Sequence, residues 1–149
     1  MEYIHRFRVK APLFHVVAFH GQSASMGAIT PPPIRVELRR APVTLSSGSE
    51  MDFTLWLGPL TIGWAALIEG MSESGFTDRQ LSGPFSEWVH RHAFVRVDDQ
   101  TTEVIDRISL RLKLHPWWGP VGLGFLLGLP VLFAYRSRAT RRLLEKGSD

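Results

Sequence analysis

The sequence predicts an α+β fold in which an antiparallel sheet of about seven strands curves around a long C-terminal helix, with two short helices after the first strand. Three observations predict it. The chain opens with an alternating segment, six strand-like runs follow with short turns between them, and an apolar segment then ends in residues at helical spacing. One long helix cannot cover a flat sheet of this width, so we expect a curved sheet with a pocket between sheet and helix.

The first elements follow from alternation and from residues typical of helix ends. In residues 3–9, aromatic, histidine and valine side chains alternate with isoleucine and arginine, which indicates a strand. A proline opens the apolar segment 13–20 and a glycine ends it, which is typical of a short helix. Residues 22–30 are small and polar enough for a second short helix or a loop. The three prolines at 31–33 predict an extended connection.

Six strand-like runs come next, separated by turn residues such as Ser-Ser-Gly, Gly-Pro and Asp-Asp. Consecutive strands with such short connections indicate an antiparallel meander. A His-Pro pair follows the last run and ends it. The runs cover residues 34–38, 50–57, 61–69, 76–81, 87–97 and 101–114.

The last long element is apolar enough to raise the question of a membrane. Residues 117–135 contain no charged side chain, and a run of about 18 apolar residues or more is a candidate membrane span. The alternative is a helix that is apolar almost all round because one side meets the sheet and the other a cavity or a partner. We favour the buried helix, because a single span would leave the strands uncovered. Membrane contact through residues 117–135 and a homodimer with close helix contact at Gly124 and Gly128 stay open.

Composition favours one globular domain. The chain has 149 residues, 44% of them hydrophobic and 21% charged, so we expect residues 1–149 to form a single domain. It contains no cysteine, which excludes disulfides, thiolate nucleophiles and cysteine-ligated zinc or iron–sulfur centres. The lack of cysteine fits a cytoplasmic protein, and the first residues lack the apolar stretch of a secretion signal.

The charge pattern gives no sign of a nucleic-acid partner. The formal net charge is +3, and most of the charged residues are scattered along the chain. A nucleic-acid footprint usually needs a basic patch that is continued by aromatic or loop contacts. The one local cluster consists of Arg136, Arg138, Arg141, Arg142 and Lys146.

The most informative run is 87–97, where alternation places His90 and His92 on one face between aromatic side chains. If a three-residue turn at 98–100 joins this run to the next, the register places His92 opposite Asp106. A buried carboxylate needs a partner. We therefore expect His92 and Asp106 to form a cross-strand pair on the inward face.

This pair has three interpretations: structural support or ligand orientation, acid–base catalysis, and metal binding. The sequence ties no serine or other nucleophile to it, so a catalytic constellation is incomplete. Zinc needs three or four ligands, and apart from Asp106 no third histidine or carboxylate has an obvious register. We favour structural support or ligand orientation and expect neither a metal nor a cofactor.

The same region begins a longer pattern that resembles a known family. The pattern is Phe76-x-Asp78-x-Gln80-x-x-Gly83-Pro84-Phe85-x-x-Trp88-x-His90-x-His92-x-Phe94, then Thr102-x-x-x-Asp106, His115-Pro116 and Phe133-x-Tyr135-Arg136. With the early proline-initiated helix, it covers nearly the whole chain and resembles the START-like (SRPBCC) superfamily, especially its polyketide cyclase/dehydrase-like ligand-binding branch. The resemblance implies a helix-grip fold. It also implies a cavity for a lipid, sterol, polyketide, quinone or other hydrophobic ligand, in which some members catalyse cyclisation, dehydration or hydrolysis.

We therefore expect the chain to bind a small hydrophobic ligand, lipid-, polyketide- or quinone-like, between the sheet and the C-terminal helix. One alternative is an enzyme of cyclase or dehydratase type, with His92 as catalytic acid/base, Asp106 orienting it and His90 polarising a carbonyl. Another is a membrane- or partner-associated protein that acts through the C-terminal helix. The expected ligand-binding residues are Trp56, Trp64, Trp88, Phe94, Phe125, Leu129 and Phe133 as apolar walls, with His90 and His92 as polar anchors.

Overall fold

A computed structural model describes residues 1–145 of the chain. Within these residues it has a mixed architecture of strands and helices in the predicted order. The elements are β1 (Glu2–Val9), α1 (Leu13–His20), α2 (Ser25–Ala28), β2 (Ile34–Arg40), β3 (Glu50–Leu57), β4 (Leu60–Ser72), β5 (Gly75–Ser82), β6 (Phe85–Asp98), β7 (Thr101–Leu112) and α3 (Trp118–Glu145).

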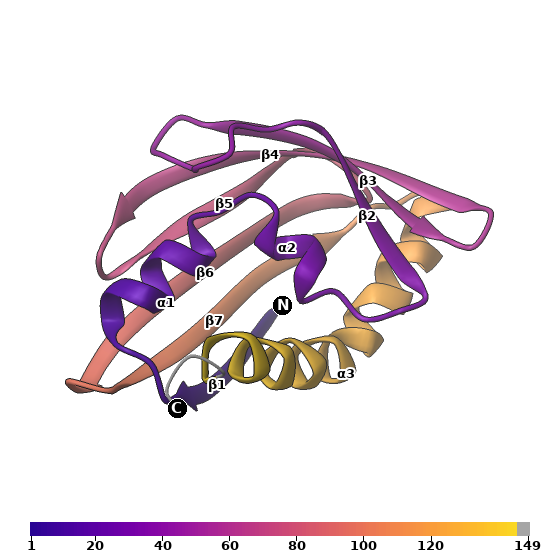
Figure 1. Ribbon diagram of the computed structural model, residues 1–149. Helices are drawn as coiled ribbons and strands as arrows, with labels where there is room; N and C mark the ends of the chain where they lie inside the picture. The colour runs from indigo at the N-terminus through magenta and orange to yellow at the C-terminus, as the bar shows by residue number, and fades with distance from the viewer. Residues whose placement is uncertain (146–149) are drawn as a thin grey trace.

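The strands form one antiparallel sheet in the order β1-β7-β6-β5-β4-β3-β2. Strands β2 to β7 are a meander, and β1 pairs with β7, so β1 and β2 lie at opposite edges. The sheet curves around α3, while α1 and α2 connect the two edges across its concave side (Figure 1). The predicted curved sheet, early short helices and long C-terminal helix are therefore confirmed.

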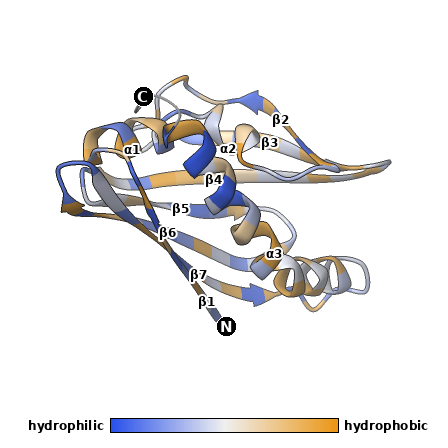
Figure 2. Ribbon diagram, turned by 60° about the horizontal axis from the view of Figure 1, so that its bottom comes forward, coloured by the Kyte–Doolittle hydropathy of each residue, from blue (hydrophilic) through white to orange (hydrophobic). Residues whose placement is uncertain are grey.

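Hydrophobic and hydrophilic residues alternate along the strands (Figure 2), and the core side chains lie on the concave face of the sheet. Trp64 on β4 and Trp88 on β6 meet edge to face with ring centroids 5.2 Å apart. Phe85 is fully buried, and its ring centroid lies 5.0 Å from that of Trp88. The ring centroid of Phe125, on α3, lies 6.1 Å from that of Trp64. Burying each of these rings contributes roughly 1.5 to 3 kcal/mol, so this aromatic cluster joins the sheet to the helix.

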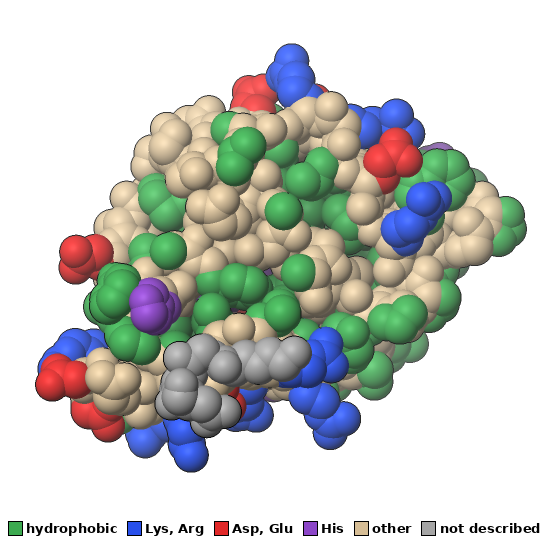
Figure 3. Space-filling view, viewed as in Figure 1, with side chains coloured by type: hydrophobic (Ala, Val, Ile, Leu, Met, Phe, Trp, Pro, Cys, Tyr) green, Lys and Arg blue, Asp and Glu red, His purple; other side chains and the backbone are tan. Residues whose placement is uncertain are grey.

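Helix α3 packs by one side only. Leu129 and Phe133 are buried against the sheet, whereas Leu123, Leu127 and Val131 are 44%, 73% and 73% exposed. Hydrophobic side chains accordingly reach the surface along this part of the molecule (Figure 3). Among residues 1–145 the sheet covers the inner side of the helix and nothing packs on its outer side, so the expected cover of that outer side by a partner stays a prediction.

The same helix passes a simple test for a membrane span. Trp118–Leu144 is long and apolar enough to cross a bilayer, with a mean hydropathy of 1.5 and 17% of its apolar window buried. Length and composition alone do not separate a span from a helix of a soluble protein. Pro130, which has no N–H to donate, lies inside the helix, and the helix changes direction along its length (Figure 1).

Three local features differ from the sequence predictions. The three prolines form a turn rather than an extended segment, because the Ile34 N–H donates to the Pro31 carbonyl at 3.0 Å. The β6–β7 connection is one residue shorter than predicted, since Asp98 pairs with Thr101 after a register shift. The basic cluster is described as far as Arg142, and Lys146 lies outside the described residues.

Candidate functional site

A cavity of about 130 Å³ lies between the concave face of the sheet, α2 and α3. Its walls are mainly apolar side chains from both the sheet and the helices. One end is different, because carboxylate, imidazole and guanidinium groups meet there. The principal apolar wall residues are Met51, Phe53, Trp64, Trp88, Phe125 and Phe133.

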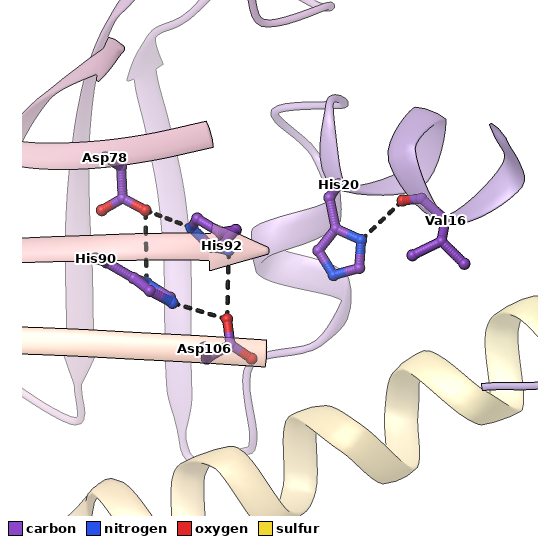
Figure 4. A network of polar contacts seen from close by, with 6 residues as sticks. All are labelled: Val16, His20, Asp78, His90, His92 and Asp106. Atoms are coloured by element: carbon purple, nitrogen blue, oxygen red, sulfur yellow. Dashed lines mark hydrogen bonds and ion pairs between the residues drawn. The ribbon is translucent and has the colours of Figure 1, made fainter. Parts of the chain in front are cut away.

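The polar end is built on three adjacent strands (Figure 4). Asp78 comes from β5, His90 and His92 from β6, and Asp106 from β7. His90 Nε2 lies 2.8 Å from Asp106 Oδ1, and His92 Nε2 lies 2.6 Å from Asp78 Oδ2. Two longer contacts close the ring: His90 Nδ1 to Asp78 Oδ2 at 3.5 Å and His92 Nδ1 to Asp106 Oδ1 at 3.4 Å. We call these four residues the His–Asp ring.

Strand register explains the shape of the ring. His92 faces Asp106 across β6 and β7, as predicted, and His90 faces Asp78 across β5 and β6. The two short hydrogen bonds nevertheless join diagonal neighbours, which lie within reach on one face of an antiparallel sheet. The register of Asp106 is thus as predicted, but its hydrogen-bond partner is His90 rather than His92.

Burial and charge set the protonation of the ring. Burial alone would lower the pKa of His92, but the close contacts of its ring with Asp106 and Asp78 and the charges of these two carboxylates raise it to about 9. Burial and the charge on His92 lower the pKa of His90. Burial alone would raise the pKa of both carboxyls, but the two histidines hold each pKa below its usual range. At neutral pH, His92 is therefore an imidazolium, His90 is neutral, and both carboxylates are ionised.

Two further polar residues complete this end of the cavity. The Nδ1–H of His20, at the end of α1, donates to the Val16 carbonyl at 2.8 Å. Burial lowers the pKa of His20 to about 4, so its Nε2 is an acceptor at neutral pH. Arg136 enters from α3, with its guanidinium carbon 5.5 Å from the centre of the Phe133 ring. Burial lowers its pKa, but a guanidinium remains charged in a protein.

The strand that carries Asp78 is held at both ends by specific residues. Gly75 has φ +139°, and a Cβ there would lie 1.8 Å from the His92 carbonyl oxygen, so only glycine fits. At the other end, the Gln80 amide exchanges hydrogen bonds with the backbone of Phe85, at 2.8 and 3.2 Å. These contacts fix β5 against β6 and so place Asp78 beside the two histidines.

Asp78, His90 and His92 offer three metal-ligand atoms within 4.8 Å of one another. Asp78 is thus the third ligand that the sequence analysis did not find. Two ligand atoms on one tetrahedral zinc ion lie about 3.3 Å apart, however. The 2.6 Å between His92 Nε2 and Asp78 Oδ2 is a hydrogen-bond distance, so the present geometry is that of a proton-linked network.

Comparisons with known proteins connect this geometry to a fold family. No protein-family model matches the sequence, and a search of curated proteins finds no significant match. A START superfamily protein from Mycobacterium smegmatis has a similar structure, with a TM-score of 0.72, 13% identity and 97% of each chain covered. The chain has the START-like helix-grip fold. The sequence pattern and the structure therefore lead to the same fold.

Two solved enzymes share this START-like fold with the chain. The ZhuI aromatase/cyclase from Streptomyces sp. R1128 has a TM-score of 0.69 and 17% identity, with 99% of this chain and 98% of that chain covered. Norcoclaurine synthase from Thalictrum flavum, solved with dopamine and hydroxybenzaldehyde, has a TM-score of 0.70 and 11% identity, with 99% and 87% covered. Likeness at these identities establishes the fold and not the activity.

Within the START-like fold, the cavity brings together only part of the expected residue set. Phe94 and Leu129 are buried nearby but are not among the cavity-lining residues. Trp56 lies on the convex face of β3, where its indole N–H donates to Glu37 at 3.2 Å, because it alternates with the inward Phe53 and Leu55. The expected residues that do line the cavity are Trp64, Trp88, His90, His92, Phe125 and Phe133.

Three ionisable wall residues were not predicted from the sequence. Asp78 carries a detectable signal, since a charged residue two positions after the inward Phe76 has to face inward too. Arg136 follows Phe133 by one helical turn and shares its face. His20 carries no comparable signal, because a histidine at the end of a short helix is as common on a surface as in a site.

Proposed function

We propose that the chain binds a compact hydrophobic ligand, about the size of one aromatic ring, in the cavity between the sheet and α3. The observation that carries this proposal is a cavity with mainly apolar, aromatic walls into which Asp78, His90 and His92 of the His–Asp ring also face. Ligand sites of this kind are largely apolar, with a few polar groups that fix the orientation of the ligand.

The size of the cavity narrows the ligand class. An engineered cavity of about 150 Å³ in another protein binds benzene. The present volume of about 130 Å³ therefore suits one substituted ring and is too small for a fatty acid or a sterol. The dopamine and hydroxybenzaldehyde held by norcoclaurine synthase are single-ring compounds of this size. From the lipid-, polyketide- and quinone-like ligands expected from sequence, we favour the compact aromatic ones.

Tryptophan fluorescence tests this proposal, because Trp64 and Trp88 line the cavity. We expect 4-hydroxybenzaldehyde to quench the emission saturably and decanoate to have no saturable effect. Ala66→Leu fills the cavity from β4 and is expected to abolish quenching. Its matched control is Ala65→Leu, the adjacent position on the other face of the same strand. Saturable binding that survives Ala66→Leu would place the ligand elsewhere and contradict the proposal.

A second candidate function is proton-transfer catalysis, and the raised pKa of His92 favours it. At neutral pH the His92 imidazolium is an acid at the cavity wall, and the neutral His90 beside it is a base. Such a pair suits enolisation, in which a carbonyl oxygen is protonated as a proton leaves the neighbouring carbon. NMR of deuterium exchange into phenylacetone measures this step. An exchange rate equal to that of buffer, or unchanged in His92→Gln, would contradict the acid role.

Membrane contact through α3 remains a prediction, and the exposed side chains Leu123, Leu127 and Val131 favour it. Arg138 and Arg142 are exposed basic residues further along the same helix and suit an anionic lipid surface. Co-sedimentation with phosphatidylserine vesicles tests the contact, and Leu127→Glu is expected to weaken it. Analytical ultracentrifugation of the same samples tests the predicted homodimer.

A further inference from the structure

Arg136 is a polar residue at the cavity whose hydrogen bonding is incomplete. Its Nε is buried and has no hydrogen-bond partner in the structure. None of the ion pairs within residues 1–145 includes its guanidinium. The side chain is half-buried over the Phe133 ring and lines the cavity. It therefore presents a charged donor to a space in which no described residue accepts its Nε–H.

Such an arrangement is costly for the unliganded protein. A buried donor without an acceptor loses the free energy of its hydrogen bond to water, and the loss is larger for a charged group. Asp106 and Asp78 favour the charge of Arg136 through space. Their short hydrogen bonds, however, go to His90 and His92. The carboxylates thus offset the charge of Arg136 without satisfying its Nε–H.

A second donor on the cavity wall has the same deficit. His92 Nδ1 is buried without a hydrogen bond, because its 3.4 Å contact with Asp106 is too poorly aligned to be one. Since the pKa of His92 is about 9, this nitrogen carries a proton at neutral pH. Of the three buried side-chain atoms without partners in the described residues, the two that belong to cavity-lining residues, Arg136 and His92, are therefore both donors. Each of these two N–H groups can therefore donate to an acceptor on a ligand.

We infer that the ligand is an aryl carbonyl compound whose oxygen accepts hydrogen bonds from Arg136 Nε, supported by His92 Nδ1, while its ring packs against the aromatic wall. This inference rests on the proposed function and names the ligand class. The shared chemistry is a carbonyl-type oxygen attached to one ring, as in an aryl aldehyde, ketone or carboxylate. An oxygen of this kind accepts through two lone pairs and so can serve both donors.

Calorimetric titration with three matched compounds tests the inference. Ethylbenzene and acetophenone have nearly the same shape, and only the second has a carbonyl oxygen; benzoate adds a negative charge. We expect acetophenone and benzoate to bind roughly ten- to a hundredfold more tightly than ethylbenzene, which corresponds to one hydrogen bond to a charged donor. Arg136→Leu is expected to remove this preference and to leave ethylbenzene binding in place. Arg138→Leu, an exposed arginine on the same helix, is the control and is expected to behave as the wild type.

The outcomes separate this inference from the proposed function. If ethylbenzene binds as tightly as acetophenone and benzoate, a water molecule suffices for Arg136 and the inference is wrong, while the proposed function stands. If none of the three compounds binds, both are wrong. A second measurement covers the case in which Arg136→Leu does not fold. The Arg136 Nε–H NMR signal of the wild type, assigned with Arg136→Lys, is expected to shift with acetophenone and not with ethylbenzene, and an unmoved signal overturns the inference.

Discussion

The two faces of the sheet carry the same kind of interaction in opposite settings. On the concave face, His90 and Asp106 form an ion pair whose side chains are only 5% and 9% exposed. On the convex face, Arg79 and Glu69 form one at 2.7 Å whose side chains are 44% and 41% exposed. The pair on the concave face belongs to the His–Asp ring, whereas the pair on the convex face is exposed to solvent. Distance alone therefore does not rank the importance of these pairs.

The difference teaches which charges hold the protein together. A solvated pair contributes roughly 0 to 1 kcal/mol, because water and salt compete with each partner. A buried pair contributes little net free energy compared with apolar residues, but removal of one partner costs roughly 3 to 5 kcal/mol, since the other charge stays buried. The concave face is thus sensitive to single substitutions, and the convex face tolerates them.

The largest expected effect follows from removal of a ring carboxylate. Asp106→Ala leaves His90 and the His92 imidazolium without their common partner, so we expect a loss of roughly 3 to 5 kcal/mol of unfolding free energy. Urea denaturation at neutral pH measures it. The control is Glu103→Ala, which removes an exposed-face carboxylate from the same strand. Equal losses in the two variants would mean that the two faces do not differ.

The next effect compares two tryptophans on opposite faces. Trp64→Ala removes a ring from the aromatic cluster and is expected to lower the free energy of unfolding by about 3 kcal/mol. This is the lower end of the range for a large buried ring, because one side of the indole already borders the cavity. Trp56→Ala removes a contact with Arg35 and a hydrogen bond to Glu37, and about 1 kcal/mol is expected. Thermal unfolding of both variants checks the order, and a larger loss for Trp56 would contradict it.

The histidines at the polar end give stability two opposite pH slopes. The folded pKa of His92 is raised to about 9, so its contribution is complete below about pH 6.5 and is lost as the pH rises to about 9. The folded pKa of His20 is lowered to about 4, so its contribution is complete above about pH 6.5 and is lost as the pH falls to about 4. We therefore expect maximal stability near neutral to slightly acidic pH.

Single substitutions separate the two slopes. Measurement of Tm against pH separates them. His92→Gln is expected to reduce the fall of Tm above about pH 6.5, and His20→Gln is expected to reduce the fall of Tm between about pH 6.5 and 4. His15→Gln, an exposed histidine on α1, is the control and is expected to change neither slope. An alkaline slope that persists in His92→Gln would show that His92 does not carry the proton.

The smallest effect is expected on the convex face. Glu69→Ala removes the partner of Arg79, and we expect a loss below about 1 kcal/mol that shrinks further at high salt. Urea denaturation at low and high sodium chloride concentration measures both properties. A loss as large as that of Asp106→Ala would remove the contrast between the faces.

The fold could be predicted from the sequence because the local alternation and turn residues indicate each strand. Alternation within 87–97 and an assumed three-residue turn predicted the β6–β7 register. The turn is one residue shorter, but the register shift between Arg96 and Asp98 compensates for it, so His92 still lies opposite Asp106. The hydrogen bonds between the side chains could not be predicted in this way. Choosing between His90 and His92 as the partner of Asp106 requires the position of Asp78, which lies on a third strand.

Other differences have the same origin in non-local structure. Trp56 and Trp64 are both aromatic residues in apolar strands, and only the register between β3 and β4 shows that they point to opposite faces. Helical spacing places Arg136 on the same face as Phe133, but only the curved sheet brings that face close to β5 and β6. Hydropathy likewise marked α3 as apolar, but it could not show which side the sheet leaves uncovered.

The pairing of β1 with β7 has a consequence for how the chain is made. Met1 and Leu110 exchange backbone hydrogen bonds although they are 109 positions apart. At about 5 to 20 residues per second, β1 waits on the order of 5 to 20 seconds on the ribosome before its partner strand exists. An unpaired strand invites association with other nascent chains, and charged residues along it reduce that risk. Arg6 and Arg8, which pair with Glu103 in the folded sheet, are charged residues of this kind on the first strand.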